Sequence, residues 1–105
     1  MRRVMVKYKV KADRAAENER YIKAVFAQLE RDQPPGLRYA SFKLDDGLGF
    51  VHVASIEAAD GQNPLLALQA FKDFAAQIQD RCDEPPVTTT LSEIGSYRFF
   101  AGERP

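Results

Sequence analysis

Hydrophobic and polar residues alternate strictly at the start of the chain. In "RRVMVKYKVK" (residues 2–11), one set of alternate positions is apolar or aromatic and the other is mostly basic; the first set is Val4, Val6, Tyr8 and Val10. Period-two alternation is typical of a strand with one buried face. Two further strands are predicted at "LRYASFKL" (37–44) and "GFVHVASIE" (49–57). The intervening "DDG" predicts a tight turn, so these two strands should form an antiparallel hairpin.

Two other segments have helical spacing. Residues 14–32 carry one apolar stripe, made of Tyr21, Ile22, Val25, Phe26 and Leu29, and "QPPG" ends this helix because proline cannot continue it. A second helix is predicted over about 64–82, followed by a final strand within "TTTLSEIGSYRFF" (88–100). The order β-α-β-β-α-β predicts a single α+β, ferredoxin-like domain over residues 1–105. Its four-stranded antiparallel sheet should carry both helices on one face.

The phase of each strand determines which residues face the helices. We predict that the helices cover the Val4–Val10 set, then Ala40, Phe42 and Leu44, then Val51 and Val53. The opposite face would carry Met5, Lys7, Lys9, Tyr39, Ser41, Phe50, His52 and Ala54, while the phase of the last strand stays open. Such a face is too apolar for water and too polar for a dry core. A homodimer packed sheet to sheet around a cavity would satisfy both demands.

Composition excludes several classes of protein. The 105 residues have a formal net charge of zero, so there is no basic field to hold a nucleic acid backbone. A single cysteine, Cys82, cannot form an internal disulfide and suits a reducing compartment, and no apolar run predicts a leader or a membrane anchor. We therefore expect a cytoplasmic protein without membrane or nucleic acid partners. One histidine and one cysteine do not make a zinc site, and no glycine-rich phosphate loop occurs, so neither a metal nor a cofactor is expected.

The layout resembles the dimeric α/β-barrel superfamily, and within it the antibiotic-biosynthesis-monooxygenase-like proteins. The segments that carry the resemblance are "YASFKLDDGLGFVHVASIE", "ALQAFKDFAAQIQDRC" and "GSYRFF", and it extends over nearly the whole chain. The resemblance implies a dimeric α/β barrel. Members include cofactor-independent monooxygenases of polyketide anthrones, haem-degrading monooxygenases, muconolactone isomerases and proteins of no known activity. The haem-degrading pattern is not expected here, because its first-strand asparagine and its tryptophan are missing.

The only histidine, His52, lies within the third predicted strand. An imidazole titrates near neutrality, so His52 is the candidate catalytic base, with Tyr39 or Lys7 polarising a substrate oxygen. The candidate ligand-binding residues are Lys9, Ser41, Phe50 and Met5. This predicts a cofactor-independent monooxygenase or isomerase-like enzyme acting on a small organic molecule. Two alternatives stay open: a dimeric barrel that binds a small ligand without turnover, and a purely structural module in which His52 only makes hydrogen bonds.

Overall fold

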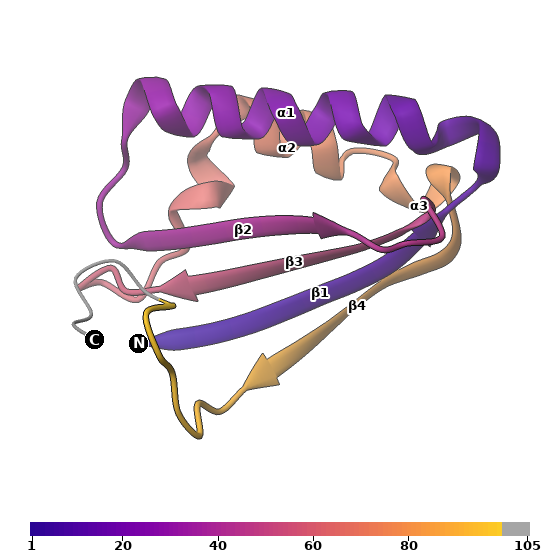
Figure 1. The fold of residues 1–105 in the computed structure, drawn as a ribbon. Coiled ribbons are helices and arrows are strands. Elements are labelled where there is room, and N and C mark those ends of the chain that lie inside the picture. The colour runs from indigo at the N-terminus through magenta and orange to yellow at the C-terminus, as the bar shows by residue number, and fades with distance from the viewer. Residues whose placement is uncertain (100–105) are drawn as a thin grey trace.

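The computed structural model describes residues 1–99. Within them the strands are β1 (Arg2–Val10), β2 (Leu37–Lys43), β3 (Gly49–Ile56) and β4 (Cys82–Leu91); the helices are α1 (Ala15–Asp32), α2 (Gln69–Ala75) and α3 (Ile78–Arg81), with 3-10 turns η1 (Ala12–Arg14) and η2 (Pro64–Ala67). The strands form one antiparallel sheet in the order β2-β3-β1-β4. Helices α1 and α2 lie over one face, and no described helix covers the other (Figure 1). The predicted ferredoxin-like α+β fold is confirmed.

The predicted second helix is broken into short pieces. Asn63 caps only the turn η2, where its side-chain oxygen accepts the Leu65 N–H at 3.0 Å. Helix α2 ends at Ala75, and Gln77 then adopts a left-handed backbone with φ of 58°. Cys82 therefore begins β4, whereas the periodicity placed it on a helix.

The last strand starts and ends earlier than predicted. Pro85 and Pro86 lie inside β4, whose register with β1 shifts between Lys7 and Lys9 and again before Val10. Proline is tolerated there because β4 is an edge strand with irregular pairing. The predicted strand does not extend into "GSYRFF": residues 95–99 are not in a strand, so that part of the prediction is wrong. Phe100 lies outside the described residues.

The predicted phase of β3 is also wrong. On β1, Tyr8 and Val10 are buried as predicted. The register with β1 pairs Val6 with His52 and Tyr8 with Phe50. Directly paired residues of antiparallel strands share one face, so His52 and Phe50 point toward the helices. Both are almost fully buried, at 4% and 2% exposure.

Because β2 pairs with β3 in the hairpin, the side chains of β2 also lie on the faces opposite to those predicted. Tyr39 pairs with Ala54 and Ser41 with His52, so these side chains also lie on the helix side. The residues predicted to be covered lie instead on the bare face; by the strand register they are Ala40, Phe42, Val51 and Val53. Leu44, just after β2, lines a pocket on that face with Lys7 and Lys9. The prediction failed because valine suits either side of a sheet, whereas a histidine is buried only when its nitrogens find partners. The bare-face positions of Met5, Lys7 and Lys9 are confirmed, since they alternate with buried Tyr8 and Val10.

The apolar core lies between this sheet and the helices. Its buried members are Tyr8, Val10, Val25, Phe50, Leu65, Leu68, Phe74 and Cys82. The stripe predicted on α1 packs against it, through Val25 and the partly buried Tyr21, Ile22 and Leu29. Burial of this stripe holds α1 across the sheet and so fixes the position of every side chain on the inner face of that helix.

The strand phase can be tested by comparing two phenylalanines that lie on the two paired strands of the hairpin. Phe50→Ala should lower the free energy of unfolding by about 3–5 kcal/mol, because it leaves a cavity under the helices. Phe42→Ala should cost less than about 1.5 kcal/mol, because that ring is 49% exposed. Urea denaturation measures both, and a greater loss for Phe42→Ala would contradict the observed phase.

Candidate functional site

A line of hydrogen bonds crosses the sheet under the helices. The Arg81 guanidinium donates from Nε to Asn18 Oδ1 at 3.2 Å, and Asn18 Nδ2 donates to Tyr8 Oη at 2.9 Å. Tyr8 Oη lies 2.8 Å from His52 Nε2. These four side chains come from α3, α1, β1 and β3, so one set of polar contacts joins four elements of the fold.

The other ring nitrogen of His52 contacts two hydroxyls on β2. Nδ1 lies 2.8 Å from Tyr39 Oη and 2.7 Å from Ser41 Oγ. We call the six residues Arg81, Asn18, Tyr8, His52, Tyr39 and Ser41 the His52 network. Within residues 1–99, every buried side-chain nitrogen and oxygen has a hydrogen-bond partner.

Burial keeps the titratable members of the network uncharged. It lowers the pKa of His52 from its ordinary 6.5 to about 4, because no charged partner offsets the loss of water. Burial also raises the pKa of Tyr39 to about 12. It raises the pKa of Tyr8 as well, against a smaller opposing effect of the hydrogen bond from Asn18. At neutral pH the imidazole is therefore neutral and both phenols keep their protons.

Arg81 is the charged member, and it is 1% exposed. Besides Asn18, its guanidinium donates to the Phe74 carbonyl at 2.6 Å and to the Ala76 carbonyl at 3.4 Å. Its Cζ lies 4.6 Å from the centre of the Tyr21 ring. Backbone carbonyls and aromatic faces thus hold the cation in one orientation.

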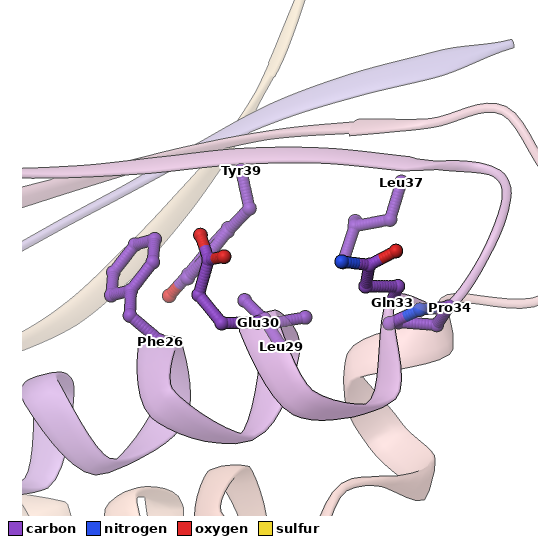
Figure 2. Close-up of a pocket in the computed structure, with 7 residues that line it drawn as sticks. All are labelled: Phe26, Leu29, Glu30, Gln33, Pro34, Leu37 and Tyr39. Carbon is purple, nitrogen blue, oxygen red and sulfur yellow. The ribbon is translucent and has the colours of Figure 1, made fainter.

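A pocket of about 380 Å³ opens between α1 and the edge strand β2 (Figure 2). Its lining residues are Phe26, Leu29, Glu30, Gln33, Pro34, Leu37 and Tyr39, and we call it the α1–β2 pocket. The Phe26 and Tyr39 rings stack with centroids 5.3 Å apart, and Figure 2 shows the Glu30 carboxylate turned toward β2. Tyr39 belongs both to this pocket and to the His52 network, so it connects the two.

The connection after α1 shapes the end of this pocket. Gln33 leaves the helix with φ of 44°, and Gly36 has φ of 79°. A Cβ at Gly36 would lie 2.7 Å from Ala58 Cα, so only glycine allows this close approach. The chain can therefore turn back at once and present Leu37 and Tyr39 to α1.

A smaller hollow of about 110 Å³ lies farther along the same gap, and Ser41, Ile22 and Phe50 are among its lining residues. Tyr39 and Ser41 therefore each line a separate hollow while both contact His52 Nδ1. In the gap between α1 and β2 the network therefore reaches hollows at the surface through the hydroxyl groups of Tyr39 and Ser41.

Of the predicted site residues, the structure brings together His52, Tyr39 and Ser41, but on the helix side of the sheet. The predicted cavity between two sheets therefore cannot contain them. Phe50 is also on the helix side, stacked on Tyr8 with ring centroids 5.6 Å apart.

Three other predicted site residues, Met5, Lys7 and Lys9, lie on the opposite face. Lys7 and Lys9 line a separate pocket of about 510 Å³ together with Asp46, Asp83 and Glu84. The sheet separates this pocket from His52. The predicted pairing of Lys7 with His52 is therefore wrong.

Sequence reasoning missed Asn18, Arg81 and Glu30, and it treated Tyr8 only as core. Asn18 had a detectable signal, since it lies three residues before Tyr21 and continues the apolar stripe of α1. Arg81 likewise lies three residues after the apolar Ile78 and directly before Cys82 in the predicted second helix. A polar residue on such a face calls for a buried partner.

Two further properties concern the described part of the chain. Among residues 1–99, no helix has both the length and the apolar character needed to cross a bilayer. In the same residues, no group of three or more histidine, cysteine, aspartate and glutamate side chains is placed to hold a metal ion.

No family model and no curated protein matches this chain. Several solved structures match it in fold. A Nitrosomonas europaea protein provisionally named an antibiotic biosynthesis monooxygenase superposes with a TM-score of 0.74 at 18% identity, over 90% of this chain and 100% of that one. The fold is that of the antibiotic biosynthesis monooxygenase structures. The resemblance seen in the sequence is thereby confirmed at the level of the fold.

Other structures of this fold differ in what is known of them. A mutant of SnoaB, a cofactor-independent oxygenase from Streptomyces nogalater, has a TM-score of 0.67 at 17% identity, over 92% of this chain and 96% of that one. A second Nitrosomonas europaea protein, of unknown function, has a TM-score of 0.70 at 12% identity, over 91% of each chain. At these identities the likeness concerns the fold alone.

The low pKa of His52 predicts how stability depends on pH. The unfolded chain binds a proton at this residue near pH 6.5, whereas the folded chain does so near pH 4, so the contribution is complete above pH 6.5 and is lost as the pH falls toward 4. Between about pH 7.5 and pH 5 the free energy of unfolding should fall by about 2 kcal/mol through this group.

Urea denaturation at several pH values measures this dependence. His52→Gln keeps a hydrogen-bonding side chain but does not titrate, so its unfolding free energy should be flatter over the same range. Because His52 is the only histidine, the comparison isolates one group. An unchanged slope in His52→Gln would contradict the neutral, buried imidazole.

Proposed function

We propose that this protein is a cofactor-independent oxygenase that acts on a small enolisable organic substrate in the α1–β2 pocket. The observation that carries the proposal is the double position of Tyr39, which lines the pocket and lies 2.8 Å from buried His52 Nδ1. A protonated phenol held by a fixed neighbour is suited to donate to an oxygen that gains negative charge. The pocket volume falls within the usual range for small-molecule sites. The fold shared with SnoaB, a cofactor-independent oxygenase, supports the same class of reaction.

The proposed chemistry begins with proton removal. The substrate carbonyl oxygen accepts a hydrogen bond from Tyr39, and a proton on a CH₂ carbon conjugated with that carbonyl passes to the Glu30 carboxylate, which lines the same pocket. The resulting enolate reduces dioxygen. One oxygen atom becomes a carbonyl at the former CH₂ carbon, the other leaves as water, and the substrate supplies all four electrons. Reprotonation of the enolate at another carbon, without oxygen, would give an isomerase.

This proposal changes the role expected for His52. A general base must lie within hydrogen-bond reach of the proton that it removes. His52 is not among the residues that line the α1–β2 pocket, and both of its nitrogens already contact hydroxyls, so neither nitrogen is open to a substrate. We assign it to holding Tyr39, and we assign proton removal to Glu30.

A second candidate function is binding of the same kind of ligand without turnover. The exposure of Glu30 favours it, since water competes with a substrate for an exposed carboxylate. The two functions differ in oxygen consumption, so one pair of measurements separates them.

Dithranol (1,8-dihydroxyanthrone) is a suitable enolisable probe. The wild-type chain should raise oxygen uptake above the spontaneous rate, as followed with an oxygen electrode. Glu30→Gln should lower kcat by about 10²–10⁴-fold with little change in KM, because it removes only the base. Tyr39→Phe should lower kcat by about 10²–10³-fold, because it removes the donor to the enolate.

Tyr97→Phe is the matched control for the tyrosine variant, since Tyr97 lies outside the α1–β2 pocket and is 71% exposed. Its rate should equal that of the wild type. If dithranol raises the melting temperature but oxygen uptake stays at the spontaneous rate, the binding function is correct. If dithranol neither stabilises the wild-type chain nor is oxidised by it, both functions are wrong for this class of ligand.

We also propose that the chain forms a homodimer through the bare face of the sheet. The corrected strand phases make this face more apolar than the sequence suggested, since Ala40, Phe42, Val51, Val53 and Val87 all lie on it. Val87 is 63% exposed and Phe42 is 49% exposed. An apolar face of this kind is typical of a partner surface.

Sedimentation equilibrium tests the homodimer. The wild type should have the mass of two chains, and Val87→Asp should shift it toward one chain because it places a charge in the interface. Leu66→Asp is the matched control, since that side chain is 59% exposed on the turn η2, away from the sheet. A wild-type mass of one chain at millimolar concentration would contradict the homodimer.

A further inference from the structure

We propose that Asn18 and Arg81 are positioning residues that hold His52 in the tautomer with its hydrogen on Nδ1. This in turn directs one hydroxyl hydrogen of the Tyr39–Ser41 pair out of the network, toward the hollows between α1 and β2. The role of that hydrogen in catalysis rests on the proposed function, whereas the tautomer itself does not. The direction of hydrogen-bond donation is fixed at Arg81, because a guanidinium can only donate.

Arg81 fixes the orientation of the Asn18 amide. A guanidinium has only donors, so the atom of Asn18 that faces Arg81 Nε at 3.2 Å must be the oxygen. The amide nitrogen then faces Tyr8 Oη at 2.9 Å and donates to it. The reverse orientation would set two donors against each other in a site that water does not reach, since Asn18 is fully buried.

Tyr8 in turn determines whether His52 Nε2 donates or accepts a hydrogen bond. Its oxygen already accepts from Asn18, and its own hydrogen has His52 Nε2 as a partner at 2.8 Å. Tyr8 keeps this hydrogen at neutral pH because burial raises its pKa. His52 Nε2 therefore accepts. A neutral imidazole with a bare Nε2 carries its hydrogen on Nδ1.

The hydrogen on Nδ1 leaves one hydroxyl hydrogen of β2 without an acceptor inside the network. Nδ1 donates to Tyr39 Oη or Ser41 Oγ, which lie 2.8 Å and 2.7 Å away. The two hydroxyls hold two further hydrogens, and they cannot donate to each other at the same time. At least one O–H must therefore point outward, to an oxygen in one of the hollows that Tyr39 and Ser41 line.

This direction defines the chemical class of the ligand. A group that only accepts hydrogen bonds, such as a carbonyl or an enolate oxygen, matches an outward O–H. In the opposite tautomer Nδ1 would accept one hydroxyl, the other hydroxyl would donate to the first, and no hydrogen would need to leave the network. Asn18 and Arg81 thus act on the pocket through three other side chains, without touching a ligand.

Nitrogen-15 NMR of the side chain of His52 tests the tautomer directly. The chain has one histidine, so its two ring signals need no further assignment to a residue. At neutral pH the wild type should show Nδ1 as the protonated nitrogen and Nε2 as the bare one. A wild-type ring with its hydrogen on Nε2 would overturn the proposal without any variant.

Asn18→Asp reverses the direction while keeping the partner of Arg81. The new carboxylate can only accept, so Tyr8 must donate to it and accept from His52 Nε2. The ring hydrogen should therefore move from Nδ1 to Nε2, with the backbone amide spectrum showing that the fold is kept. Gln79→Glu is the matched control, because it adds the same charge on α3 at an exposed position two residues from Arg81. It should leave the hydrogen on Nδ1.

Each outcome bears on the proposal. A folded Asn18→Asp chain that keeps its hydrogen on Nδ1 would overturn the role of Asn18, and a swap in Gln79→Glu would show that charge alone sets the tautomer. If Asn18→Asp does not fold, the wild-type spectrum still decides the tautomer. No substrate enters these measurements, so failure of dithranol oxidation would count against the proposed function and leave the tautomer standing.

Discussion

The constraint on which the structure depends is that a buried imidazole needs a partner at each of its two nitrogens. Leaving one buried polar group unsatisfied costs about 1–3 kcal/mol. His52 meets this demand from both neighbouring strands, with the Tyr8 hydroxyl of β1 on one side and the hydroxyls of β2 on the other. Asn18 and Arg81 extend the same contacts to α1 and α3. The polar contacts run across the strands and through a core that is otherwise apolar, so they also specify how the sheet and the helices align.

Local pattern was sufficient for part of the fold. The alternation around Tyr8 predicted β1, the stripe through Val25 predicted α1, and Asp46 and Gly47 predicted the hairpin turn. Local pattern failed where pairing partners decide the outcome. Pro85 lies in a strand because β4 is at the edge of the sheet, and Gln77 ends a helix that apolar spacing alone would continue. Neither edge position nor backbone strain is visible in the spacing of apolar residues.

The site was predictable by residue type and not by location. His52, Tyr39 and Ser41 were chosen for their chemistry, and the structure does join them, but under the helices. Their face depends on contacts that are distant in sequence: Tyr8 lies 44 residues from His52, and Arg81 lies 63 residues from Asn18. A single sequence shows no such pairing. It could, however, have identified Asn18 as a polar residue on an apolar stripe, which is the signature of a buried contact.

The two prolines of β4 have a consequence for assembly. The outer edge of a sheet normally presents amide hydrogens to which a further strand can add. Pro85 and Pro86 have no such hydrogen, and the register of β4 is irregular beside them. This edge therefore resists growth of a continuous sheet from one molecule to the next. Self-association is directed away from open-ended fibres, and closed assemblies of few copies are favoured instead.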